Sequence, residues 1–289
     1  MVGGDAGGDG AADASNDTGE GADWTTVTSA STNGGFYGVW GSAGADVWAV
    51  GDYGLTHWNG TAWSVTTGTT GLRGVWGSST SDVWAVGIGG TIQHWDGTGW
   101  TPTTSGTTDY VLGVWGVGTS NVWAVGRNGM ILYWNGTTWA PSTSGASGDL
   151  EGVWGTGASD VWAVGVAGAI QHWDGSAWSP SVSGTTSQLN AVWGSSPSDV
   201  WVVGETATLH WNGAAWSPST NAAVNGLFGL WGSSPTDVWA VGGYGPIQHW
   251  DGSSWQASTS TVNQLRGVWG SSAIDVWAVG DFRTIMHHE

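Results

Sequence analysis

The feature that most constrains this chain is a tryptophan-rich repeat. Each complete copy holds a tryptophan in Val-Trp-Gly or Leu-Trp-Gly, one in Asp/Asn-Val-Trp, one in His/Tyr-Trp-Asp/Asn-Gly, and one just after that turn. The first signature occurs seven times, at steps of 36 to 39 residues. A repeat of this length with four short apolar segments is typical of a propeller blade. We therefore expect an all-β, seven-bladed β-propeller with four antiparallel strands in each blade.

The seventh copy is incomplete, and a segment that could complete it stands near the other end of the sequence. The last copy stops at residues 285–289, where a tryptophan turn and a fourth strand should come. Residues 22–25 (Ala-Asp-Trp-Thr) have the character of that segment and precede Trp40 at about the usual distance. An open solenoid gives no reason for this arrangement. We predict that the segment around Trp24 pairs with the strand at Ile285 and closes the last blade.

Within the second copy we expect strands over 74–77, 83–86 and 91–95 and around Trp100, called A to D from the axis outward. They are short, β-branched and aromatic, and turn residues separate them. The Asp-Gly or Asn-Gly between C and D predicts a type I′ turn, in which both central residues need positive φ. Stacked blades bury both sheet faces, and tryptophan rings of ~150–250 Å² buried area each would fill the gaps between them.

Composition separates a leader from the repeat domain and excludes several partners. Residues 1–22 hold almost nothing apolar, so we expect a disordered, acidic, Gly-rich tether, with the propeller over 23–289. The chain has four Arg, no Lys and a net charge of -18, which argues against nucleic acid and anionic membrane surfaces. No apolar run reaches the ~18 residues needed for membrane insertion. The lack of Cys excludes disulfides and thiolate metal sites.

The copy over residues 189–216, LNAVWGSSPSDVWVVGETATLHWNGAAW, resembles the tectonin-type propeller repeat. That repeat alternates a small-Val-Gly strand, a Val-Trp-x-Val strand and an aromatic strand before an Asp-Gly-x-x-Trp turn, and the resemblance covers residues 24–289. Tectonin-like propellers include lectins that recognise bacterial or modified glycans. The resemblance therefore implies sugar binding, and we expect an extracellular or bacterial cell-surface location.

Loop topology sorts the turn residues onto two rims. The A–B and C–D turns form one, here called the uniform rim, where Asp or Asn recurs. The Asp and Asn side chains there can cap the backbone of their own turns. No Asp-x-Asp-x-Asp calcium loop is present. The B–C loops, the D–A connections and the residue entering each strand A form the varied rim. Loops that vary on a rigid scaffold usually carry binding, although neutral drift is an alternative. Its candidate ligand-binding residues are Tyr37, Asp52, Tyr53, Arg73, Arg127, Asn128, Glu151, Asn190, Glu205, Tyr244 and Arg266.

One histidine or tyrosine recurs in each predicted strand C. A single histidine per blade cannot converge on a metal ion, so we expect no metal site. One interpretation is a buried imidazole hydrogen-bonded between blades. The other is a repeated sugar pocket, in which a pyranose stacks on a tryptophan while polar groups orient its hydroxyls. The histidines of that pocket would be His57, His94, His172, His210 and His249.

These observations favour a multivalent, lectin-like propeller that recognises cell-surface glycans, because several weak pockets on one ring gain avidity. The alternative is a protein–protein interaction module at a bacterial cell surface with a single site on the varied rim. We do not expect an enzyme: Glu151 and Glu205 are the only framework glutamates near the varied rim, and no Ser-His-Asp, Walker or dinucleotide motif is evident. We expect a monomer without a cofactor.

Overall fold

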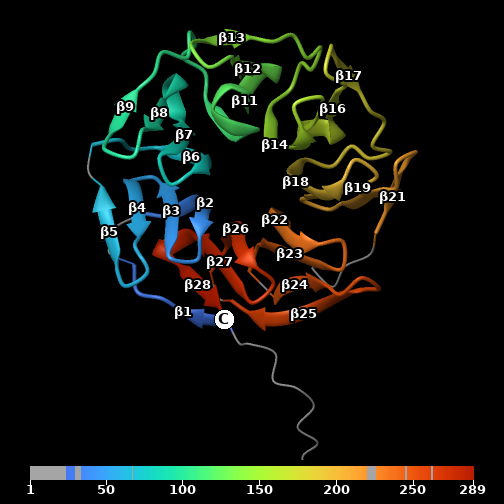
Figure 1. The fold of residues 1–289 in the computed structure, drawn as a ribbon. Coiled ribbons are helices and arrows are strands. Elements are labelled where there is room, and N and C mark those ends of the chain that lie inside the picture. Colours follow the sequence, from blue (N-terminus) through green and yellow to red (C-terminus); the bar gives the residue numbers. More distant parts are fainter. Residues whose placement is uncertain (1–23, 30–33, 67, 220–225, 245, 262) are drawn as a thin grey trace, which may run out of the picture.

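The structure, a computed structural model, describes residues 24–29, 34–66, 68–219, 226–244, 246–261 and 263–289. Seven four-stranded antiparallel sheets form a ring around a central axis (Figure 1). This confirms the predicted fold class. The tether predicted over residues 1–22 lies outside the described residues. Within the described ranges, no helix has the length and apolar character that crossing a membrane requires.

The strands of each blade follow in the order A, B, C and D, and seven blades share the pattern. Blade 1 contains β2 (Phe36–Ala43), β3 (Asp46–Gly51), β4 (Gly54–Trp58) and β5 (Trp63–Thr66), and blade 2 contains β6 (Leu72–Ser79), β7 (Asp82–Gly87), β8 (Ile92–Trp95) and β9 (Trp100–Pro102). Blade 3 contains β10 (Val111–Gly116), β11 (Val122–Gly126), β12 (Ile131–Trp134) and β13 (Trp139–Pro141), and blade 4 contains β14 (Leu150–Gly157), β15 (Asp160–Gly165), β16 (Ile170–Trp173) and β17 (Trp178–Pro180). Blade 5 contains β18 (Leu189–Ser196), β19 (Asp199–Gly204), β20 (Thr208–Trp211) and β21 (Trp216–Pro218), and blade 6 contains β22 (Leu227–Ser234), β23 (Asp237–Gly242), β24 (Pro246–Trp250) and β25 (Trp255–Ser260). Blade 7 contains β26 (Leu265–Ser272), β27 (Asp275–Gly280), β28 (Ile285–His288) and β1 (Trp24–Thr26). Short 3-10 turns are η1 (Ile88–Gly90), η2 (Gly118–Ser120), η3 (Arg127–Gly129), η4 (Val166–Gly168) and η5 (Asp281–Arg283).

Blade 7 is completed by the N-terminal strand, as the sequence predicted. In Figure 1 the blue strand β1 lies beside the red strand β28. Trp24 pairs with His288, Thr26 pairs with Met286, and the Val27 amide donates to the Ile285 carbonyl at 2.9 Å. The Trp24 side chain is only 6% exposed. The ring is therefore closed by a hydrogen-bonded ladder and by a buried aromatic side chain.

The core lies between blades, where the strand-B tryptophans interlock neighbouring sheets. Trp201 of blade 5 lies 4.9 Å from the Trp250 ring and 5.3 Å from the Trp255 ring of blade 6, centroid to centroid. The same arrangement links blade 7 to blade 1, where Trp277 meets the tryptophans of β4 and β5. The interior is thus a set of inter-blade clusters rather than one central core.

The glycine of each Val-Trp-Gly signature is required by a second ring of tryptophans, on strand A. A Cβ atom added to Gly77 would lie 2.6 Å from Cη2 of Trp40 in the preceding blade and 2.7 Å from the Asp82 carbonyl oxygen. Gly41 meets Trp269 in the same way, which closes this second ring. A side chain at these positions would push neighbouring blades apart.

The C–D turns differ from the predicted type I′ geometry. Four residues connect β4 to β5, and Gly60 has φ +89° whereas Asn59 is not left-handed. The Asn59 Oδ1 instead accepts the backbone N–H groups of Thr61 and Ala62, both at 3.0 Å. The prediction of type I′ turns was wrong because an Asx side chain closes the turn in place of a second left-handed residue.

Candidate functional site

The uniform rim carries a repeated network of serine or threonine, aspartate and histidine at the A–B turns of six blades. In blade 2, His94 Nε2 lies 2.7 Å from Asp82 Oδ1, and the Ser78 hydroxyl donates to Asp82 Oδ2 at 2.5 Å. The imidazole also stacks on Trp84, with the ring centroids 4.1 Å apart. The equivalent His–Asp pairs are His57–Asp46, His172–Asp160, His210–Asp199, His249–Asp237 and His287–Asp275, all at 2.6 Å.

These histidine bonds correct one interpretation of the sequence. We expected a bond between blades, but histidine and aspartate belong to adjacent strands of one sheet, as β8 and β7 show for His94 and Asp82. Blade 3 replaces the whole network: the Tyr133 hydroxyl donates to Asn121 Oδ1 at 2.6 Å, and Val117 stands where the serine should be. Joint replacement indicates that the residues act as a unit. The sugar pocket proposed for the histidines stays a prediction.

The carboxylates of this network make the free energy of unfolding depend on pH in the acid range. Burial alone would raise the pKa of Asp82, but the hydrogen bonds from His94 and Ser78 outweigh it and hold that pKa below its usual value. Burial is likewise outweighed at Asp237, whose pKa is also lowered. A lowered folded-state pKa stabilises the protein at pH values above the unfolded-state pKa, about 3.9, and that contribution is lost as the pH falls through the folded-state pKa.

We predict that the free energy of unfolding in urea falls between pH 5 and pH 2, in part through Asp82. A triple variant, Ser78→Val with Asp82→Asn and His94→Tyr, gives blade 2 the network residues of blade 3. It should fold, and its unfolding free energy should fall less steeply with acid than that of the parent chain. Superimposable acid profiles would contradict the assignment.

On the varied rim, residues that enter strand A in neighbouring blades contact one another around the axis. The Arg73 Cζ lies 3.9 Å from the Tyr37 ring centroid, and the Arg266 Cζ lies 4.9 Å from the same ring. Arg266 also lies 5.8 Å from the Phe228 ring. We call Phe228, Arg266, Tyr37 and Arg73, from blades 6, 7, 1 and 2, the arginine–aromatic cluster. Partly desolvated guanidinium–ring contacts of this kind are favourable.

Two aspartates of the B–C loops orient the arginines. Asp52 accepts bonds from Arg73 Nη1 and from the Tyr37 hydroxyl, each at 3.3 Å. Asp281 accepts bonds from Arg266 Nε at 2.7 Å and Nη2 at 3.2 Å. Burial raises the pKa of Tyr37, an effect that Arg73 opposes. Among the described residues, the hydrogen bonds of Arg73 use Nη1 alone, to Asp52 and to the Leu72 carbonyl, and those of Arg266 use Nε and Nη2. Arg73 Nε and Nη2 and Arg266 Nη1 are therefore donors that a ligand could use.

A second polar group lies on blades 4 to 6 of the same rim. Gln188 Nε2 donates to Glu151 Oε1 at 3.3 Å and to Asn190 Oδ1 at 3.0 Å. Asn190 Nδ2 in turn donates to the Leu227 carbonyl at 2.7 Å. Burial raises the pKa of Glu151, and the Asp149 charge adds to this rise. The axial part of the rim is therefore rich in arginine and aromatic side chains on one side, and in amide and acidic side chains on the other.

The remaining predicted residues lie outside both groups. Arg127 covers the Tyr110 ring at 3.9 Å, and the Asn128 backbone N–H donates to Asp149 at 2.9 Å. Tyr53 and Tyr244 are exposed in their B–C loops, and the Glu205 amide donates to the Gln188 carbonyl. The structure thus brings Tyr37, Arg73 and Arg266 together in the arginine–aromatic cluster, with Asp52 bonded to Tyr37 and Arg73. It brings Glu151 and Asn190 together through Gln188.

Sequence reasoning left Phe228, Asp281 and Gln188 out of the candidate site. Phe228 occupies the repeat position of Tyr37, and Asp281 occupies that of Asp52, so aligning the copies position by position could have found both. Gln188 lies in a D–A connection, where an alignment of the copies does not mark it as a site residue.

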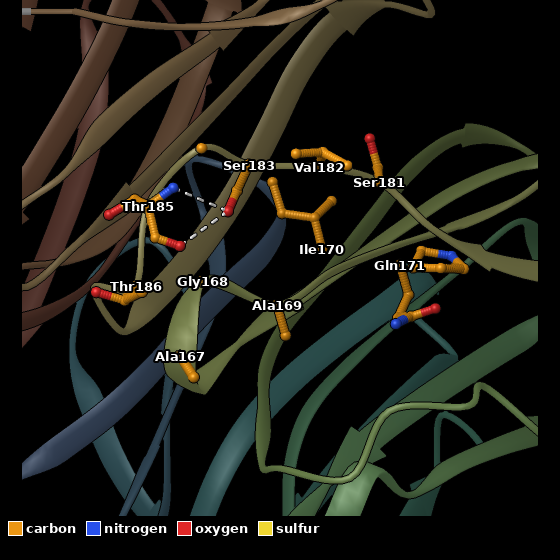
Figure 2. Close-up of a pocket in the computed structure, with 12 residues that line it drawn as sticks. Ala167, Gly168, Ala169, Ile170, Gln171, Ser181, Val182, Ser183, Thr185 and Thr186 are labelled. Carbon is orange, nitrogen blue, oxygen red and sulfur yellow. Dashed lines mark hydrogen bonds between the residues drawn. The ribbon is translucent and has the colours of Figure 1, made fainter.

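Two open grooves lie on the outer part of the varied rim. The larger, about 640 Å³, is lined by residues 167–171 and 180–186 of blade 4, and the Ser183 hydroxyl bonds Thr185 at its edge (Figure 2). A groove of about 580 Å³ occupies the same place in blade 2, lined by Gly90 and residues 103–108. Small and hydroxyl-bearing residues dominate both linings, and neither includes an aromatic side chain. In the part of the chain that the structure describes, no three histidine or acidic side chains are grouped to hold a metal ion.

No protein-family model and no curated protein sequence matches the chain. Among solved structures, YCF48 bound to a D1 peptide is similar with a TM-score of 0.75 and 16% identity, over 94% of this chain and 99% of that one. YCF48 from Cyanidioschyzon merolae is similar with a TM-score of 0.75 and 16% identity, over 93% of this chain and 99% of that one. The WD40 β-propeller domain of Doa1 is similar with a TM-score of 0.80 and 11% identity, over 94% of this chain and 97% of that one. At these identities the likeness shows the propeller fold. None of the three identifies the tectonin-type repeat that the sequence resembles.

Proposed function

We propose that this chain is a protein-interaction propeller that holds a segment of a partner protein at one site on the varied rim. The observation that carries the proposal is the asymmetry of the axial surface. Phe228, Arg266, Tyr37 and Arg73 lie on four consecutive blades and contact one another, whereas blades 4 and 5 place Glu151 and Asn190 at the same repeat position. Arginine and aromatic side chains dominate binding hot spots between proteins.

The comparisons support a peptide as the class of ligand, by analogy of fold. One solved propeller of similar shape, YCF48, is bound to a D1 peptide. A ring of sugar pockets has less support. The histidines proposed for it already bond aspartates through Nε2, and the two repeated grooves lack an aromatic plate. A bacterial-surface location stays a prediction.

We propose binding without catalysis. Glu151 accepts a bond from Gln188, so its carboxylate is held by a neighbouring amide. Glu205 belongs to a separate turn, where its backbone bonds the Gln188 carbonyl. Paired carboxylates that perform acid–base chemistry need to flank one reacting bond, and the contacts of these two glutamates give no such arrangement.

The test is peptide selection followed by calorimetry. A random 12-residue peptide library is panned on the immobilised chain, and we expect selected peptides to bind with a stoichiometry of one. Arg73→Glu should weaken binding by about 30-fold, since a hot-spot residue contributes ~2 kcal/mol or more. Arg127→Glu makes the same charge change outside the arginine–aromatic cluster and should alter the affinity by less than about threefold.

Equal losses in the two variants would place the site elsewhere. The lectin hypothesis predicts a different calorimetric result: a simple glycan that binds the chain with a stoichiometry near seven. That result, together with failure to select any peptide, would overturn the proposal.

A further inference from the structure

The B–C loop of blade 7 adopts a backbone conformation that its residues disfavour. In η5, Phe282 has φ +54° and Arg283 has φ +63°. The same turn in blades 2, 3 and 4 uses Gly89, Asn128 and Ala167 at the first of these positions and glycine at the second. Bulky side chains rarely occupy the left-handed region because Cβ approaches the backbone. The fold alone therefore favours a glycine or another small residue where Phe282 stands.

Phe282 does not offset this strain by burial, because its side chain is 72% exposed. The same repeat position holds Tyr53 in blade 1 and Tyr244 in blade 6, which are 62% and 59% exposed. Blades 2 to 5 place Gly89, Asn128, Ala167 and Thr206 there. Aromatic loop tips thus occur on blades 6, 7 and 1, which are adjacent in the ring and contribute Phe228, Arg266 and Tyr37 to the arginine–aromatic cluster. Exposed apolar groups gathered in this way mark interaction surfaces.

The loop is tied directly to the arginine–aromatic cluster. Asp281, the residue before Phe282, holds the Arg266 guanidinium through two hydrogen bonds. Arg73 and Arg266 pair with Asp52 and Asp281, so the four charges cancel in this part of the rim, in a chain whose formal charge is -18. This part of the rim is a local surface on which an anionic group of a partner would be accepted rather than repelled.

We propose that the three aromatic loop tips and the arginine–aromatic cluster form one docking surface for an extended protein segment that carries a carboxylate beside a large apolar side chain. The carboxylate takes the guanidinium donors of Arg73 and Arg266 that the two aspartates leave open. The apolar side chain packs on Phe282 and removes it from water. The inference rests on the proposed function and names the chemistry of its partner. The carboxylate belongs to an Asp or Glu side chain of that segment.

The variant Phe282→Gly distinguishes a binding role from a structural one, because it should weaken peptide binding without lowering the melting temperature. Glycine adopts positive φ readily, so the variant should melt at the same temperature as the parent chain or higher. Its affinity for the selected peptides should fall at least tenfold. Ala167→Gly is the matched control: it relieves the same strain in the same turn of blade 4, where φ is +55°, and should leave the affinity unchanged.

Two libraries distinguish the source of the carboxylate. In one, the 12-residue peptides are fused at their C-terminus, so only Asp or Glu can supply it; in the other, the C-terminus is free. We expect an acidic residue next to an aromatic or aliphatic one in both libraries; peptides selected only from the second library, through a free terminus, would contradict the assignment to a side chain. Failure to select any peptide overturns the proposed function itself. Selected peptides that bind Phe282→Gly as tightly as the parent chain, or that need no carboxylate, overturn this inference and leave the proposed function standing.

Discussion

Deleting residues 1–27 is expected to destabilise the whole ring, because the deletion leaves blade 7 with three strands. It removes β1 from the exposed edge of β28 and takes Trp24 from its contacts with Trp239 and His288. Loss of a buried tryptophan alone costs about 3–5 kcal/mol, and the lost ladder adds to it. Since total stabilities are about 5–15 kcal/mol, we expect the melting temperature to fall by at least ~10 °C in a circular dichroism melt.

A shorter deletion is the matched control. Removing residues 1–22 keeps β1, and we expect the melting temperature of the full chain, because that segment holds almost no apolar side chain to bury. A synthetic peptide of residues 20–30, added to the longer deletion, should restore part of the lost stability by pairing with β28. If both deletions melt like the full chain, closure by β1 contributes nothing and the account of the ring is wrong.

The ring itself was predictable because the tryptophans that pack the blades together recur in the repeat. Interlocking of blades needs the same tryptophans at the same spacing, so the packing leaves a periodic trace, and Trp24 reveals closure as the one member out of register. Turn geometry was less accessible. Asx-Gly serves both a type I′ turn and a longer Asx-capped loop, and the pairing of Trp58 with Trp63 across β4 and β5 selects the longer loop.

The site was predictable only as a set of candidates. Positions that break the repeat stand out along the chain, but the contact of Arg266 with Tyr37 joins blade 7 to blade 1 and exists only once the ring is closed. The partner of each strand-C histidine had a signal that sequence reasoning passed over: blade 3 exchanges Tyr133, Asn121 and Val117 together. The strain at Phe282 had only a partial signal: Arg283 stands where blades 2 to 4 place glycine, but the backbone angle itself comes from the structure.

Trp201→Ala should produce a large loss of stability from a single substitution, about 4 kcal/mol. The side chain is 2% exposed and stacks on His210 in its own blade while it meets Trp250 and Trp255 of the next. Urea unfolding measures the loss. Tyr53→Ala is the control, an aromatic truncation at an exposed loop tip, and should change stability by less than about 1 kcal/mol.

A double-mutant cycle tests whether that loss comes from the contact between blades. Trp201→Ala and Trp255→Ala remove the two sides of one edge-to-face pair, so their combined cost should fall short of the sum by about 0.5–1.5 kcal/mol. Trp201→Ala combined with Trp48→Ala removes rings that pack in different inter-blade clusters, and these two costs should add. Additivity in both pairs would mean that each tryptophan stabilises only its own sheet. Coupling in the first pair alone would show that the propeller is held together by contacts between neighbours, which is why the strand that completes blade 7 matters to all seven blades.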